Sequence, residues 1–90
     1  MTDIPNVLSL SKAAEICIKT DKPLQLDYFV PSLYKQCKIA RDEDSKVLWK
    51  NDDEMTSPLK SMFKVDNGQS GSDFILETQN SVYLVSGLMF

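Results

Sequence analysis

The residues with the clearest chemical potential are six carboxylates within thirteen positions, in the segment RDEDSKVLWKNDDE that covers residues 41–54. Three acids precede a short apolar run and three follow it. Carboxylates in such number could bind a metal ion, form a docking surface for a basic partner, or keep two turns hydrated. The six residues are Asp42, Glu43, Asp44, Asp52, Asp53 and Glu54.

The spacing of these acids argues against a metal site. A calcium-binding loop that began at Asp42 would place Lys46 at its fifth position and Val47 where the sharp turn requires glycine. The two acidic groups cannot share one ion either, because residues 45–50 in extended form span roughly 20 Å at about 3.3 Å per residue. We therefore predict no metal site and no cofactor.

General acid–base chemistry has few side chains to use, because the chain contains no histidine. Asp27 lies between Leu26 and Tyr28 of a predicted strand and Glu77 follows Leu76 in another, and we expect both on the solvent face. Cys17 and Cys37 form no C-x-x-C pair, and no base that could activate Cys17 is visible beside it in the sequence. We therefore predict no catalytic residues and no enzyme; activity based on Asp27 or Glu77 is the weakest alternative.

The charge balance disfavours direct contact with nucleic acid. The 90 residues include 13 acids and 10 bases, and Arg41 is the one arginine, whereas nucleic-acid-binding surfaces need a basic excess. Residues 1–41 carry a net charge of +2 and residues 42–54 a net charge of −4. No apolar run approaches the roughly 18 residues of a membrane-spanning helix, and no secretory signal is visible. We predict one small cytoplasmic domain over residues 1–90, without nucleic acid or membrane partners.

Residues 7–23 have the pattern of an amphipathic helix. Apolar residues recur at helical spacing, so they share one face that we expect to pack on the core. Ser9 or Ser11 can cap its start, and Pro23 ends it. The expected buried face consists of Val7, Leu10, Ala14, Cys17 and Ile18.

After Pro23 the hydrophobic period changes from 3.6 residues to two, which indicates short strands. The predicted fold class is α+β, with the N-terminal helix packed on a bent antiparallel meander or small open barrel of about five to six strands. The predicted strands lie within residues 24–30, 34–41, 46–50, 59–65, 73–78 and 81–86.

Strands that alternate up and down would bring the loops 42–45 and 66–73 to one end of the sheet. This end would be an acidic docking face, and the apolar residues at 88–90 would either fold back or enter a partner. We therefore predict a small non-enzymatic protein that binds and modulates, for example inhibits, another protein with a basic surface. The predicted partner-binding residues are Asp42, Glu43, Asp44, Asp66, Asp73, Leu88, Met89 and Phe90.

Aromatic and lysine side chains between residues 28 and 38 support an alternative function. A homo-oligomer could bind a small ligand such as a nucleotide in pockets between its subunits, since aromatic rings stack on bases and ammonium groups pair with phosphates. The residues predicted to line such a pocket are Tyr28, Phe29, Tyr34, Lys35 and Lys38.

Overall fold

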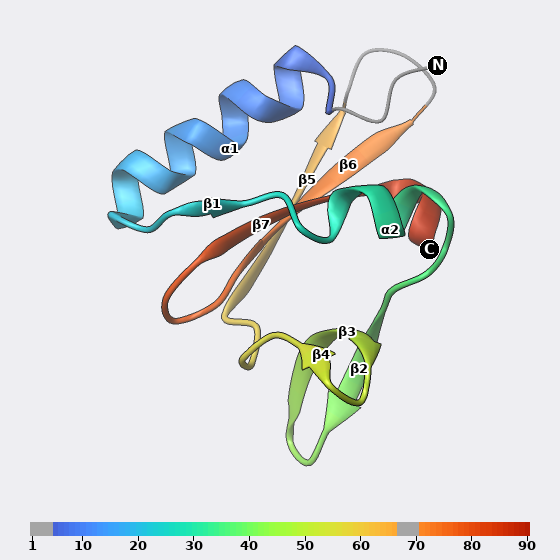
Figure 1. The fold of residues 1–90 in the computed structure, drawn as a ribbon. Coiled ribbons are helices and arrows are strands. Elements are labelled where there is room, and N and C mark those ends of the chain that lie inside the picture. Colours follow the sequence, from blue (N-terminus) through green and yellow to red (C-terminus); the bar gives the residue numbers. More distant parts are fainter. Residues whose placement is uncertain (1–4, 67–70) are drawn as a thin grey trace.

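The computed structural model describes residues 5–66 and 71–90 and has an α+β fold without a closed barrel in this part of the chain (Figure 1). The predicted fold class and the packing of an N-terminal helix on a sheet are confirmed. No helix among the described residues is both long and apolar enough to cross a membrane. The elements are α1 (Val7–Thr20), β1 (Leu24–Gln25), α2 (Phe29–Leu33), β2 (Lys38–Asp42), β3 (Ser45–Asn51), β4 (Glu54–Met55), β5 (Ser61–Asp66), β6 (Ser72–Glu77), β7 (Val82–Ser86) and the 3-10 turn η1 (Gly87–Met89).

The strands form two sheets rather than one meander. The large sheet has the order β1-β7-β6-β5, in which β1 runs parallel to β7 and the other pairs are antiparallel. The small sheet has the order β2-β3-β4 and is antiparallel throughout. In Figure 1 the small sheet lies on the side of the molecule away from α1, and the chain enters it after α2 and leaves it before β5.

The start of α1 is capped by Asn6, whose side-chain oxygen accepts a hydrogen bond of 2.7 Å from the Leu8 N–H. The prediction of a serine cap is therefore wrong by one helical turn. The helix ends where Asp21 takes a left-handed conformation with φ of 56°, and its N–H donates to the Cys17 carbonyl. Pro23 lies two residues after Asp21, in agreement with the predicted end of the helix.

The buried face of α1 agrees only in part with the predicted one. Leu10 and Cys17 pack against the core as expected, but Ala14 is exposed. Ser9, Ala13 and Ile16 are buried against the large sheet, whereas Val7 and Ile18 are 69% and 83% exposed. Two small residues on the buried face let the helix backbone approach the sheet closely. The Ser9 hydroxyl also donates a hydrogen bond of 2.6 Å to the buried carboxylate of Asp73, which joins α1 to β6.

Residues 24–30 form a strand over Leu24–Gln25 only, because the chain then turns into α2. Pro31 is the third residue of this helix, where its missing N–H removes no intrahelical bond. Ser32 completes the turn: its N–H donates to the Tyr28 carbonyl at 3.0 Å, and its hydroxyl donates to the Phe29 carbonyl at 2.5 Å. The same hydroxyl accepts from the N–H of Ser86, so α2 is joined to β7.

The large sheet separates two hydrophobic clusters. The face toward α1 carries Ile75 and Leu84, which lie opposite each other and pack with Ala13, Ile16 and Phe29. The other face packs against the small sheet and the end of the chain. The residues of this second cluster are Tyr28, Cys37, Leu48, Leu76, Val85 and Met89.

Candidate functional site

The first acidic group forms the turn between β2 and β3. Asp42 pairs with Ser45, and Glu43 adopts a left-handed conformation with φ of 57°, so that a two-residue turn closes the hairpin. Asp42, Glu43 and Asp44 are all exposed. Figure 1 shows this turn at the tip of a hairpin that points away from the large sheet. We call these three residues the acidic tip.

The second acidic group lies at the opposite end of β3, in the turn before β4. The Asn51 side chain accepts a hydrogen bond of 2.8 Å from the Asp53 N–H, which fixes the turn. Asp52, Asp53 and Glu54 are exposed, and Glu54 lies 3.6 Å from the ammonium of Lys50. The small sheet thus carries all six carboxylates of the segment, divided between two turns.

The prediction that Asp66 and Asp73 join the acidic tip is wrong. Both belong to the large sheet, where β5 ends at Asp66 and Asp73 follows the first residue of β6. Asp73 is 3% exposed and binds Ser9, so it is not a surface residue. In Figure 1 this end of β5 and β6 lies across the molecule from the acidic tip. The prediction assumed that all strands alternate up and down in one sheet, but the chain passes from the small sheet to the large sheet between β4 and β5. Residues 67–70 of the predicted loop lie outside the described residues.

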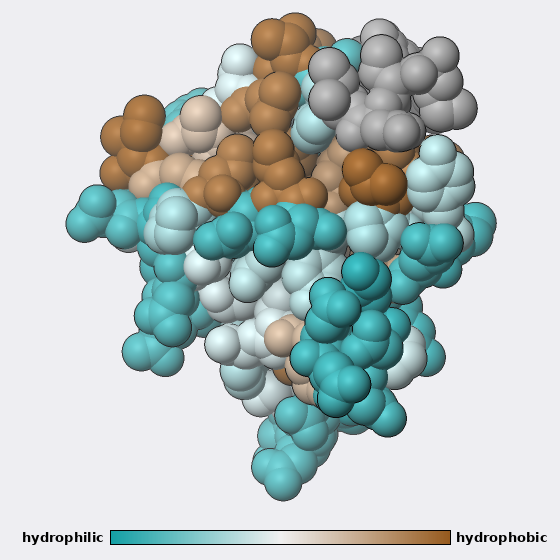
Figure 2. Space-filling model, viewed as in Figure 1, coloured by the Kyte–Doolittle hydropathy of each residue, from teal (hydrophilic) through white to brown (hydrophobic). Residues whose placement is uncertain are grey.

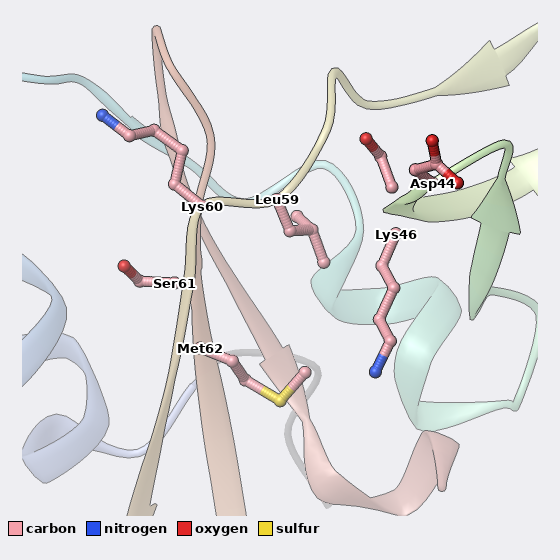
Figure 3. Close-up of a pocket in the computed structure, with 7 residues that line it drawn as sticks. Asp44, Lys46, Leu59, Lys60, Ser61 and Met62 are labelled. Carbon is pink, nitrogen blue, oxygen red and sulfur yellow. The ribbon is translucent and has the colours of Figure 1, made fainter.

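An open groove of about 420 Å³ lies between the start of β3 and the start of β5. Figure 3 shows Leu59 and Met62 between Lys46 and Lys60, and Lys60 extends away from Lys46. The two ammonium groups therefore do not converge on one anion. The groove is an open, partly apolar surface beside Asp44 and does not enclose a ligand site.

The apolar residues at positions 88–90 fold back onto the large sheet. Met89 is buried in the second cluster, and the ring of Phe90 meets the ring of Phe74 edge-on with centroids 4.8 Å apart. The Lys35 ammonium donates to the carbonyl of Leu88 at 2.6 Å and lies 3.4 Å from that of Phe90. Leu88 and Phe90 are still more than half exposed, so only Met89 is withdrawn from the predicted patch.

Two of the residues predicted to line a nucleotide pocket are buried. Phe29 belongs to the first cluster and Tyr28 to the second. Tyr34 is exposed, whereas the Lys35 ammonium is bound to the chain end. Lys38 lies over the ring of Trp49 on the small sheet, 5.0 Å from the centroid.

Trp49 and Met55 form an apolar surface that the sequence pattern did not predict. They are direct neighbours across β3 and β4; Trp49 is half-buried and Met55 is 42% exposed. The run from Val47 to Trp49 predicts a strand covered on both faces, which holds for Val47 and Leu48. One feature of the sequence could have indicated this surface, namely Met55, a large apolar residue directly after three acids.

Of the titratable residues considered for catalysis, Glu77 forms an ion pair with Lys22. Lys22 donates to Glu77 at 2.5 Å and to the Thr78 carbonyl at 2.7 Å. The hydrogen bond from Lys22 holds the pKa of Glu77 below its ordinary value although burial opposes this shift, whereas a general base needs a raised pKa. Burial raises the pKa of both Cys17 and Cys37, which keeps the thiols protonated. Asp27 is exposed, and no three Cys, Asp or Glu side chains in the described ranges converge as metal ligands.

The substitution Lys22→Met is expected to lower the free energy of unfolding by about 1–3 kcal/mol, because it leaves a largely buried carboxylate without its cation. The lowered pKa of Glu77 means that this stabilisation is complete above the unfolded pKa of about 4.3 and is lost as the pH falls through the folded pKa. Urea titrations between pH 3 and 7 should show a difference between the two proteins that shrinks toward acid.

The matched control is Lys50→Met, which removes the more exposed pair of Lys50 with Glu54. We expect this change to alter stability by less than about 0.5 kcal/mol. An equal effect of both substitutions, or a Lys22→Met effect independent of pH, would contradict the assignment.

Comparisons of the chain with protein-family models, with curated proteins and with solved structures gave no match.

Proposed function

We propose that this chain is a small non-enzymatic interaction protein that binds another protein with a basic surface and modulates it. The observation that carries the proposal is the exposure of all six carboxylates on the small sheet. Within the described part of the chain, the one salt bridge to these six side chains is that of Glu54 with Lys50. Such carboxylates project a negative potential into solvent, which steers a basic partner toward them.

The charge distribution supports the small sheet as the contact region. Residues 38–55 hold six acids and four bases, and the other parts of the chain hold seven acids and six bases. Two of the three net negative charges therefore belong to this one sheet. Trp49 and Met55 lie beside the second acidic turn, and tryptophan and methionine are residues that interfaces favour. An acidic rim beside an apolar contact is a common form of protein interface.

The double substitution Asp42→Lys/Asp44→Lys is expected to weaken partner binding about tenfold at low salt, mainly through slower association. The partner would be isolated by affinity capture, purified, and titrated at two salt concentrations by calorimetry or surface plasmon resonance. The wild-type affinity should fall as salt rises, and the affinity of the double variant should depend on salt less steeply.

The control variant Asp21→Lys/Asp27→Lys makes the same change in net charge at two exposed acids outside the small sheet. It should retain most of the wild-type affinity. Equal losses in both variants would show that only net charge matters. Unchanged binding by the acidic-tip variant would refute the proposed contact region.

A further inference from the structure

One apolar face of α1 has no partner in the described structure. Among the described residues, Val7 and Ile18 are the most exposed large apolar side chains, and Ser11 and Ala14 between them are also exposed. In Figure 2 hydrophobic surface gathers over α1, while the lower part of the same face is mostly hydrophilic. We call Val7, Ser11, Ala14 and Ile18 the α1 stripe. Exposed apolar surface of this kind marks an interaction site.

The α1 stripe has the same spacing in both directions along the helix. Intervals of four, three and four residues separate its members, with large residues at the ends and small ones in the middle. Residues at these intervals lie on one side of a helix. A second α1 in antiparallel orientation would therefore set each Val7 against the other Ile18, and each Ser11 against the other Ala14. The small central pair allows the two backbones to approach closely.

In this arrangement the charged residues beside the α1 stripe of one copy are complementary to those of the other copy. Lys12 and Glu15 lie 3.6 Å apart on the same helix, near its midpoint, and both side chains are about half exposed. With Ser11 opposite Ala14, Lys12 of one copy lies about 3 Å along the axis from Glu15 of the other, at 1.5 Å per residue. Each lysine can thus pair with the glutamate of the other copy, twice across the symmetry axis.

We propose that the α1 stripe is the interface of a homodimer, in which a second copy of this chain packs its α1 antiparallel across the first. The contact is isologous and closes on itself, so it produces a dimer and not a filament. The dimer contact uses no residue of the small sheet, so its test is independent of the test of the proposed function.

Sedimentation equilibrium of the purified chain tests the proposal. We expect twice the chain mass of 10.2 kDa at micromolar concentrations. The substitution Ala14→Glu places a charge at the centre of the contact and should raise the dimer dissociation constant at least 100-fold, with unchanged circular dichroism and Tm of the monomer fold. The control Leu88→Glu, at an exposed apolar residue away from α1, should leave the dimer intact.

A charge exchange and a cross-link test the geometry without relying on Ala14→Glu. Lys12→Glu should weaken the dimer about tenfold, and Lys12→Glu/Glu15→Lys should restore it. In a Cys17→Ala background, the Ser11→Cys variant should form a disulfide with the Ala14→Cys variant faster than with itself. A wild-type chain that is monomeric up to millimolar concentration, a dimer that tolerates Ala14→Glu in a folded chain, or preferential pairing of Ser11→Cys with itself would overturn the proposal.

Discussion

The substitution Leu48→Ala is expected to lower the free energy of unfolding by about 3–5 kcal/mol, a large part of the total for a domain of this size. Leu48 is 0% exposed and is the buried residue of the small sheet that enters the second cluster. Its neighbours there include Leu76 and Val85 of the large sheet, which are also fully buried. A cavity at this position therefore weakens the joint between the two sheets.

Urea unfolding monitored by circular dichroism measures this loss, and hydrogen exchange shows where it acts. Amides of β2 and β3 should lose protection more than those of β6 and β7, because only the small sheet depends on this joint. Met55→Ala, at an exposed position of the same sheet, is the control and should change stability by less than about 0.5 kcal/mol. A loss below about 1 kcal/mol for Leu48→Ala would argue against tight packing between the sheets.

The substitution Gly87→Ala is expected to lower the free energy of unfolding by about 2 kcal/mol or more. A methyl group at Gly87 would lie 2.3 Å from the Ser72 carbonyl oxygen and 3.3 Å from the ring of Phe74. The first contact is with the backbone of β6, which cannot move without disturbing its pairing with β7, where Asp73 lies opposite Ser86. The glycine is therefore required by close approach of two backbone segments.

The chain supplies a matched control in Gly71→Ala. Apart from Gly71 itself and its two chain neighbours, no heavy atom of the described residues lies within 4 Å of the position that a methyl group would take there. We expect a change within about 0.5 kcal/mol, because such a substitution mainly reduces the freedom of the unfolded chain. Thermal unfolding of the two variants gives the comparison, and equal Tm values would rule out the backbone contact as the reason for glycine at position 87.

Local patterns in the sequence were sufficient to predict the helix and the hairpins formed by consecutive strands. The helix over Val7–Thr20, the hairpin of β2 with β3 and the hairpin of β6 with β7 follow from periodicity and turn residues. These signals depend on a few consecutive residues, so no knowledge of the rest of the fold is needed.

The predictions failed where a distant contact decides the local structure. The buried face of α1 includes Ser9, whose hydroxyl donates a hydrogen bond to Asp73, 64 positions away. The helix α2, which takes the place of a predicted strand, is joined to β7 by the hydrogen bond from the Ser86 N–H to the Ser32 hydroxyl. Periodicity within one segment contains no information about either contact.

The candidate site was predicted in part for the same reason. The two acidic turns and their separation by β3 follow from strand geometry alone. The assignment of Asp66 and Asp73 to the same end required the order of strands in space, and the division into two sheets changes that order. The pairing of Trp49 with Met55 depends on a register shift between β3 and β4, and no turn motif in the sequence predicts this shift.

The parallel pairing of β1 with β7 has a consequence for the order of folding. Leu24 lies opposite Val82, so the edge of the large sheet beside α1 is completed only by the last strand of the chain. During synthesis the first half of the protein is therefore without its main packing surface until β7 has left the ribosome. Until then we expect the apolar residues of α1 and β1 to be exposed to solvent and accessible to chaperones. We expect the local hairpins of the small sheet to form early and to become stable only when the large sheet forms and packs against Leu48.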